Sequence, residues 1–270
     1  MTAESTPEST PESTPESTPE SMTEVPLLAA LARAGLNLHA VFAVDALPAP
    51  LRAALAAAKA PETLPRVWLI GHGGRALWAR VSAERARGGL PTAHPIDAWS
   101  VRCVREALAA HCPAARAHFL YPQPLEAPAA LDLQRLGALA GWHHPTPFMV
   151  GINAAWGTWF AYRALLLTDA PLEPTPRIDT ASPCLSCVAR PCRAACPAGA
   201  LGAPGDAAAC FDLGRCVDYR LETDSACAQT CRARLACPVA PQHRYDDAQL
   251  AHCYGESLRM LRDWRAAPPR

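Results

Sequence analysis

The arrangement of cysteines constrains this chain more than any other feature of its sequence. Nine of its twelve cysteines lie between Cys184 and Cys237. The N-terminus has no basic region followed by an apolar stretch, so no secretory signal is visible and a cytoplasmic location is expected. Because the cytoplasm keeps thiols reduced, disulfides are not expected there, and clustered cysteines indicate metal ligands first.

Two runs of cysteines have a spacing that suits iron–sulfur chemistry. The first is Cys184-x2-Cys187-x4-Cys192-x3-Cys196-Pro197, and the second is Cys216 followed by Cys227-x3-Cys231-x5-Cys237-Pro238. A [4Fe–4S] cube takes four thiolates, and in two-cluster ferredoxins the cysteine before proline ligates the cube of the other run. The sequence therefore predicts two crossed ligand sets: Cys184, Cys187, Cys192 and Cys237 for the first cube, and Cys196, Cys216, Cys227 and Cys231 for the second.

The intervals depart from the regular x2, x2, x3 spacing of bacterial ferredoxins, which leaves other metal contents open. A single cluster, a zinc site or unligated thiols are the alternatives, although zinc favours compact pairs and only Cys184 and Cys187 form one. Cys210 is close enough in sequence to Cys216 to replace it as a ligand. The isolated cysteines are expected to be buried structural residues: Cys103, Cys112 and Cys253.

Composition divides the chain into four segments. Residues 1–23 repeat Glu-Ser-Thr-Pro, which predicts a disordered tail. Residues 24–169 alternate strand and helix patterns and predict an α/β or α+β domain with its own core. The prolines of residues 170–183 predict a semi-rigid connector. Residues 184–265 would form a small ferredoxin-type domain that ends in a helix over about 246–265.

Apolar patterns predict the elements of the α/β domain. Pro26 suits a first helical turn, and Asp97 would cap a helix over 98–110. Residues 147–153 and 158–167 predict a hairpin around the turn 154–157. The remaining elements are strands over 38–43 and 66–70, the second ended by Gly-His-Gly-Gly at 71–74, and helices over 50–59, 75–87 and 131–139.

A glycine-rich turn after the second strand is a candidate phosphate site. Gly73 and Gly74 could present backbone amides to a phosphate, and Arg75 would add a positive charge. The phosphate of FMN or of cobalamin would suit this arrangement. A plain tight turn explains the same residues equally well.

Three further residues are candidates for a cofactor site in the α/β domain. His143 and His144 precede a proline in a loop, where either could face a cobalt or transfer a proton. Ordinary surface histidines are the simpler interpretation. Trp159 could stack on a flat cofactor, although cross-strand packing explains it about as well.

Several motifs resemble those of epoxyqueuosine reductase, a cobalamin-dependent tRNA-modification enzyme. They are Cys196-Pro197-Ala198-Gly199-Ala200, then Arg215-Cys216-Val217-Asp218-Tyr219, and the Gly-x-Trp-Phe-like segment Gly157-Thr158-Trp159-Phe160. The last segment, continued through Ala161 to Arg163, is also similar to that of the cobalamin-processing proteins of the cblC type. The resemblance implies a flavin-nitroreductase-like domain that binds a corrinoid, and it favours Cys216 over Cys210 as ligand.

One departure from the reductase pattern bears on activity. The family has a catalytic aspartate where this chain has Leu120-Tyr121-Pro122-Gln123-Pro124-Leu125, and neither Glu126 nor Asp132 aligns with it. This mismatch argues against epoxyqueuosine reduction itself, so whether the chain is an oxidoreductase stays open.

The expected function is an iron–sulfur redox protein that passes electrons through two [4Fe–4S] clusters to a cofactor on the α/β domain. Cobalamin is the first candidate for that cofactor and FMN the second. The alternatives are a corrinoid-binding or trafficking protein without substrate turnover, and a non-enzymatic electron carrier. The expected partner is a redox protein or a small electron donor. A net charge of zero argues against a membrane or nucleic-acid partner, with tRNA expected only for a true epoxyqueuosine reductase.

Overall fold

A computed structural model describes residues 19–58, 60–122, 131–202 and 211–266. Most of the predicted tail, Glu126 and Cys210 lie outside these ranges. In chain order the elements are α1 (Pro19–Arg33), β1 (Leu38–Ala43), α2 (Ala49–Ala57), β2 (Arg66–Gly73), α3 (Ala76–Ala86), α4 (Pro95–His111), β3 (Ala117–Tyr121), α5 (Leu133–Leu139), β4 (Phe160–Thr168), α6 (Pro183–Ser186), α7 (Pro191–Ala194), α8 (Leu213–Leu221), α9 (Arg232–Leu235), η1 (Pro241–His243) and α10 (Asp247–Ala266).

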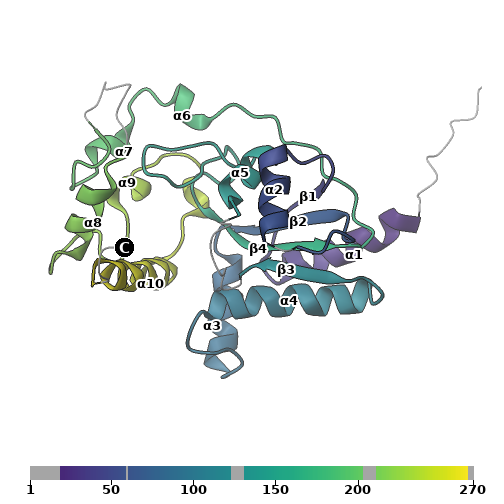
Figure 1. Cartoon of the computed structure of the whole chain (residues 1–270). Helices are drawn as coiled ribbons and strands as arrows, with labels where there is room; N and C mark the ends of the chain where they lie inside the picture. Colours follow the sequence, from purple (N-terminus) through teal and green to yellow (C-terminus); the bar gives the residue numbers. More distant parts are fainter. Residues whose placement is uncertain (1–18, 59, 123–130, 203–210, 267–270) are drawn as a thin grey trace, which may run out of the picture.

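The four strands form one antiparallel sheet in the order β1-β2-β4-β3. Successive side chains of a strand point to opposite faces, so Trp68 and Ile70 pack with α1 and α4 while Val67 and Leu69 pack with α2 and α5. The sheet therefore lies between two helical layers (Figure 1). This arrangement confirms the predicted mixed α/β class.

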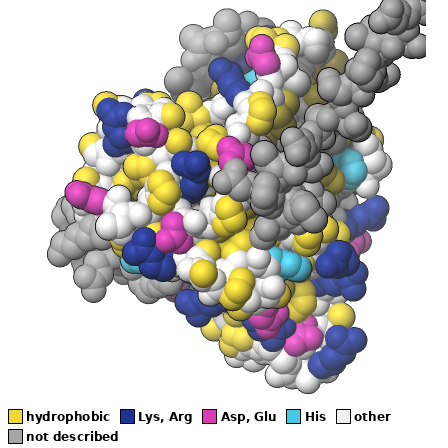
Figure 2. Space-filling model, turned by 90° about the vertical axis from the view of Figure 1, so that its right-hand side faces the viewer, with side chains coloured by type: hydrophobic (Ala, Val, Ile, Leu, Met, Phe, Trp, Pro, Cys, Tyr) yellow, Lys and Arg dark blue, Asp and Glu magenta, His cyan; other side chains and the backbone are white. Residues whose placement is uncertain are grey.

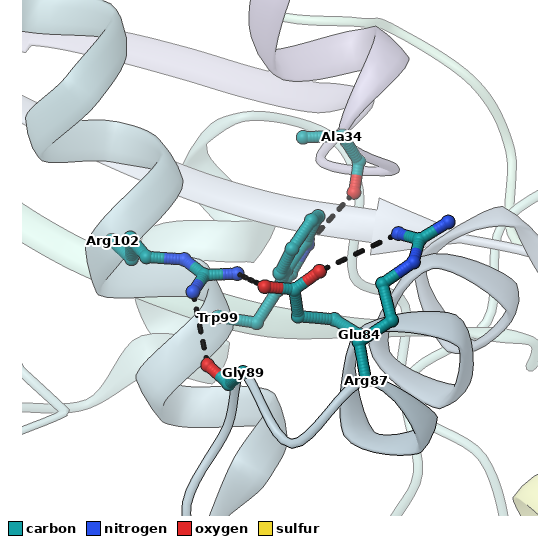
Figure 3. A network of polar contacts seen from close by, with 6 residues as sticks. All are labelled: Ala34, Glu84, Arg87, Gly89, Trp99 and Arg102. Atoms are coloured by element: carbon teal, nitrogen blue, oxygen red, sulfur yellow. Dashed lines mark hydrogen bonds and ion pairs between the residues drawn. The ribbon is translucent and has the colours of Figure 1, made fainter.

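A polar network joins α3 to the start of α4 (Figure 3). The Glu84 carboxylate accepts a hydrogen bond from Arg102 at 2.9 Å and lies 3.6 Å from the Arg87 guanidinium. Arg102 also donates to the Gly89 carbonyl and lies 4.9 Å from the centre of the Trp99 ring. Trp99 donates to the carbonyl of Ala34, the residue that follows α1, so these contacts connect α1, α3 and α4.

Four local predictions are wrong. Residues 147–153 form no strand of the sheet, and β4 pairs instead with β2 and β3. Pro147 cannot donate to a strand ladder, and Met149 has a φ of 63°, which breaks an extended segment. Strand β2 continues through Gly73 rather than ending at residue 70, and α1 begins at Pro19, inside the segment expected to be a disordered tail.

The last wrong prediction concerns the start of α4. The helix begins at Pro95 and its N-cap is His94, so Asp97 lies in the first turn instead of capping it. Proline is favoured at the first helical position because its missing N–H has no partner there in any case. The strands over 38–43 and 158–167, and the C-terminal helix, lie within a few residues of their predicted bounds.

The cysteine-rich segment lies at one end of the sheet, on the left in Figure 1, where α7 contacts α9 and α8 contacts α10. The connector that leads to it bonds to the sheet on its way. Thr175 and Val41 exchange hydrogen bonds across the edge of β1, and the Ile178 amide donates to the Ala140 carbonyl. These contacts hold the connector against β1 and the end of α5.

The face in Figure 2 shows acidic and basic side chains interspersed with apolar ones. Among the described residues, no helix combines the length and the apolar character that crossing a membrane requires.

Candidate metal centres

The eight cysteines of the two runs lie around two separate cavities. The first cavity has a volume of about 20 Å³. The second has a volume of about 350 Å³ and is lined mainly by apolar side chains, among them Phe148, Leu201 and Val217. The thiols that line the first are Cys184, Cys187, Cys192 and Cys237. The thiols that line the second are Cys196, Cys216, Cys227 and Cys231.

Short elements bring these residues together from distant parts of the chain. Ser182 caps α6 by accepting a hydrogen bond from the Cys184 amide, and Cys231 is the N-cap of α9. Gly199, with a φ of 60°, turns the chain after Cys196-Pro197. Each cavity therefore contains thiols from both runs.

The electrostatics of the thiols follow the same grouping. Burial raises the pKa of Cys184, and the neighbouring Cys237, Cys192 and Cys187 raise it further. Burial likewise raises the pKa of Cys216 to about 11. The thiols that add to this second rise are Cys231, Cys196 and Cys227. Thiols buried beside one another are costly to ionise, unless a bound cation compensates their charge.

The thiols do not form a compact site for a single ion. Within the described ranges, no three His, Cys, Asp or Glu side chains converge closely enough to hold one metal ion. Each cavity has four thiols, which is the number that a [4Fe–4S] cube takes from its protein.

The two cavities differ in size. The second offers space among apolar walls, whereas the first is only about large enough for a water molecule. Leu185 and Val188, beside the first set, are 82% and 95% exposed.

Arg234 lies in the sequence between one cysteine of each thiol group and is 7% exposed. It belongs to α9, three residues after Cys231 and three before Cys237. Its guanidinium donates to the Thr158 carbonyl and lies 4.4 Å from the centre of the Trp159 ring. Within the described part of the chain no carboxylate pairs with it. A buried cation without a counter-charge is costly, so the site suits an anionic group such as a four-thiolate cluster.

Two other arginines each lie beside one thiol group. Arg220 donates to the Cys227 carbonyl at 3.2 Å and lines the second cavity. Arg244 donates to the Leu235 carbonyl, and its charge lowers the pKa of Cys237 against the larger effect of burial.

A buried chain of contacts connects this segment to the centre of the sheet. The Tyr245 hydroxyl lies 3.0 Å from Nε2 of His72, and Arg163 Nε donates to Nδ1 of the same imidazole at 2.9 Å. Burial, and then the charges of Arg163 and Arg234, lower the pKa of His72 well below its usual value. The imidazole therefore stays neutral and joins β2 and β4 to the segment after the last cysteine. Sequence reasoning ranked His72 below His143 and His144 as a candidate, because its partners Arg163 and Tyr245 are distant in the sequence.

The backbone amides of the candidate phosphate turn donate hydrogen bonds within the protein. The Gly73 amide donates to Asn37 Oδ1, and the Gly74 amide donates to the Trp159 carbonyl, both at 2.8 Å. A side chain at Gly73 would meet the Trp156 ring, so this glycine permits close packing. Arg75 is exposed and donates to the Gln242 carbonyl. The first two amides are therefore not available to a phosphate.

The other candidate cofactor residues are also engaged. Nδ1 of His143 lies 3.0 Å from the Tyr162 hydroxyl, and burial lowers the pKa of this histidine. His144 pairs through its backbone with Ile152, and its Nε2 is buried without a hydrogen-bond partner. Trp159 is fully buried. None of the six candidate residues lines either cysteine cavity.

A third hollow of about 150 Å³ lies between the sheet and the connector. Trp142, Asn153, Trp156 and Ile178 are among its lining residues. Asn153 is held there because its side chain donates to the Trp142 carbonyl and accepts from the Trp156 amide. This hollow is smaller than the usual 300–1,000 Å³ of a pocket for an organic cofactor, so it could hold only part of one.

Asp132, one of the two acids near the expected catalytic position, has a structural role. Its carboxylate accepts a hydrogen bond from the Arg135 amide at 2.9 Å and so caps α5. Glu126, the other acid, lies outside the described residues.

No protein-family model matches the sequence, and no curated protein matches it significantly. Solved structures do match the fold. Epoxyqueuosine reductase from Bacillus subtilis is 12% identical, with a TM-score of 0.51 over 84% of this chain and 68% of that one. The same enzyme solved with an epoxyqueuosine-modified tRNA stem loop is 12% identical, with a TM-score of 0.50 over 86% and 69% of the two chains.

A C. elegans B12-trafficking protein, CblC, is 14% identical over 92% of this chain and 98% of its own. Its TM-score of 0.48 is too low to establish a common fold. The class that the structure defines is therefore a mixed α/β protein with the fold of epoxyqueuosine reductase. The predicted resemblance to that enzyme is confirmed at the level of the fold.

Proposed function

We propose that this chain is an iron–sulfur redox protein with two [4Fe–4S] clusters. The observation that carries the proposal is the distribution of eight thiols over two cavities, four at each and from both runs. Arg234 supports it as well: this arginine is buried, no carboxylate among the described residues pairs with it, and a four-thiolate cluster would supply a negative charge.

When bound, each cluster supplies one-electron transfer. The chain's own residues hold, shield and orient the sites. Apolar side chains around the second cavity exclude water, and Arg220 orders the chain beside it by bonding to the Cys227 carbonyl and to Ser257. Exclusion of water and hydrogen bonds near the sulfurs are the means by which a protein sets a cluster's reduction potential.

Cobalamin is the first candidate for the electron acceptor, and a flavin is the second. The hollow beside Trp142 and Trp156 is the described surface where one edge of such a ring could rest. The engaged amides of Gly73 and Gly74 count against a phosphate at that turn. A corrinoid-binding or trafficking protein without turnover is the second candidate function, because neither nearby acid aligns with the catalytic aspartate and one of them, Asp132, caps α5.

Anaerobic purification tests the proposal most directly. We expect about eight irons and eight sulfides per chain, together with a broad visible absorption band. Zinc without sulfide, or no metal after reconstitution with iron and sulfide, would refute it.

Cobalamin or FMN is then added to protein that has been reduced with dithionite and freed of excess reductant. A spectral change of either one identifies the acceptor, whereas no change with either leaves the chain as an electron carrier. Turnover of an epoxyqueuosine-containing tRNA stem loop would separate an enzyme from a trafficking protein.

A further inference from the structure

Arg234 is placed differently from the other arginines near the cysteines. Cys231 lines the second cavity, Cys237 lines the first, and Arg234 lies midway between them in sequence on a single short helix. Cys231 is the N-cap of α9, and Cys237 directly follows its C-cap residue, Ala236. Arg234 is therefore three residues from one cysteine of each thiol group, closer along the chain to both groups than Arg220 or Arg244.

The surroundings of Arg234 hold it in place without neutralising it. The guanidinium lies 4.4 Å from the ring centre of Trp159 and 4.9 Å from that of Tyr245. Its hydrogen-bond partners are the Thr158 carbonyl and the hydroxyls of Tyr245 and Tyr254, all of them uncharged. Its Nε is buried without a partner. A full positive charge thus remains in a setting where little water screens it.

We propose that Arg234 is the shared counter-charge of both four-cysteine sites and sets the reduction potentials of both clusters. This inference rests on the proposed function. Reduction adds a negative charge to a cluster, and a nearby fixed cation stabilises that charge. Arg234 therefore raises both potentials together, while Arg220 and Arg244 each act on one site. Arg234 is a positioning residue, since it acts through the clusters rather than on a substrate.

The test is a redox titration of the full-length, cluster-loaded chain, followed by electron paramagnetic resonance. We expect Arg234→Gln to shift both midpoint potentials to more negative values. Arg234→Lys keeps the charge and should restore them most of the way. Arg220→Gln and Arg244→Gln serve as matched controls and should each shift one potential, that of the second and the first site respectively.

Iron and sulfide content, measured on every variant, separates the possible outcomes. Full loading of Arg234→Gln with unchanged potentials overturns the inference. Loss of the clusters in Arg234→Gln but not in Arg234→Lys supports it, because charge rather than shape is then required. Loss in both variants overturns it in favour of a packing role. A wild-type chain without iron and sulfide would instead refute the proposed function.

Discussion

The sheet contains a large apolar cluster on each face, whereas the apolar clusters described near the cysteines are small. The helices α6, α7 and α9 have only four residues each, too few to be stable by themselves. The first region therefore obtains its stability from burial of apolar side chains. The second lacks a core of comparable size, and small domains of this kind usually depend on a metal. Five experiments test this contrast between the two regions.

The largest effect is expected from removal of the metal. An iron chelator under reducing conditions should expose residues 183–243 to rapid amide hydrogen exchange, because the proposed clusters would replace the missing core. Strands β2 and β4 should remain protected. Equal protection of both regions before and after iron removal would contradict the contrast.

Neighbouring cysteines of the first run should affect different clusters. Cys192 lines the first cavity and Cys196 the second, so Cys192→Ser and Cys196→Ser should each remove about four of eight irons but abolish different resonance signals. Cys253→Ser, which changes a half-buried cysteine of α10 outside both groups, is the control. Loss of the same signal in both variants would show that the ligand sets do not cross.

Truncation of a buried side chain in the sheet should lower the stability of the fold and leave the iron content unchanged. Leu166 is fully buried on β4. Leu166→Ala should lower the free energy of unfolding of the sheet by about 2–5 kcal/mol, because it removes apolar contacts and leaves a cavity. Denaturant unfolding followed by tryptophan fluorescence measures this loss, and iron content should not change. Met260→Ala, at a 67% exposed site, should have little effect.

Acid should weaken the sheet through His39. Burial lowers the pKa of this histidine beside Trp68 from 6.5 to about 4. The unfolded chain therefore binds the proton first, and stability present above pH 6.5 falls as the pH drops towards 4, by about 3 kcal/mol at most. His39→Phe keeps a ring of similar shape and should flatten this part of the pH profile. An unchanged slope would exclude His39 as its source.

The smallest effect is expected at the ion pair between α3 and α4. The carboxylate and guanidinium of Glu84 and Arg102 are partly exposed, so Glu84→Gln should cost about 1 kcal/mol or less. A double-mutant cycle with Arg102→Gln measures the coupling, which high salt should weaken. A loss as large as that of Leu166→Ala would indicate that the network is a main support of the fold.

Features that depend on local pattern could be predicted from the amino-acid sequence. Strand 38–43 and the helix over about 246–265 follow from apolar spacing, which acts over a few residues. The eight cysteines and their division into two runs follow from spacing as well, and they led to the crossed ligand sets that remain a prediction. The local pattern also gave one wrong prediction, a strand over 147–153. This segment has strand-like residues, but prolines lie in and beside it and it pairs with no strand of the sheet.

Contacts between residues that are far apart in the chain could be read only from the tertiary structure. It placed Gly73 against Trp156, used the Gly73 and Gly74 amides within the protein, and buried Trp159 beside Arg234. It also joined His72 to Tyr245 across 173 positions. Burial and missing counter-charges are properties of the folded chain, because they depend on what every other segment brings alongside. The two cysteine runs are recognisable in the sequence. The burial of Arg234 without a carboxylate partner among the described residues is visible only in the fold.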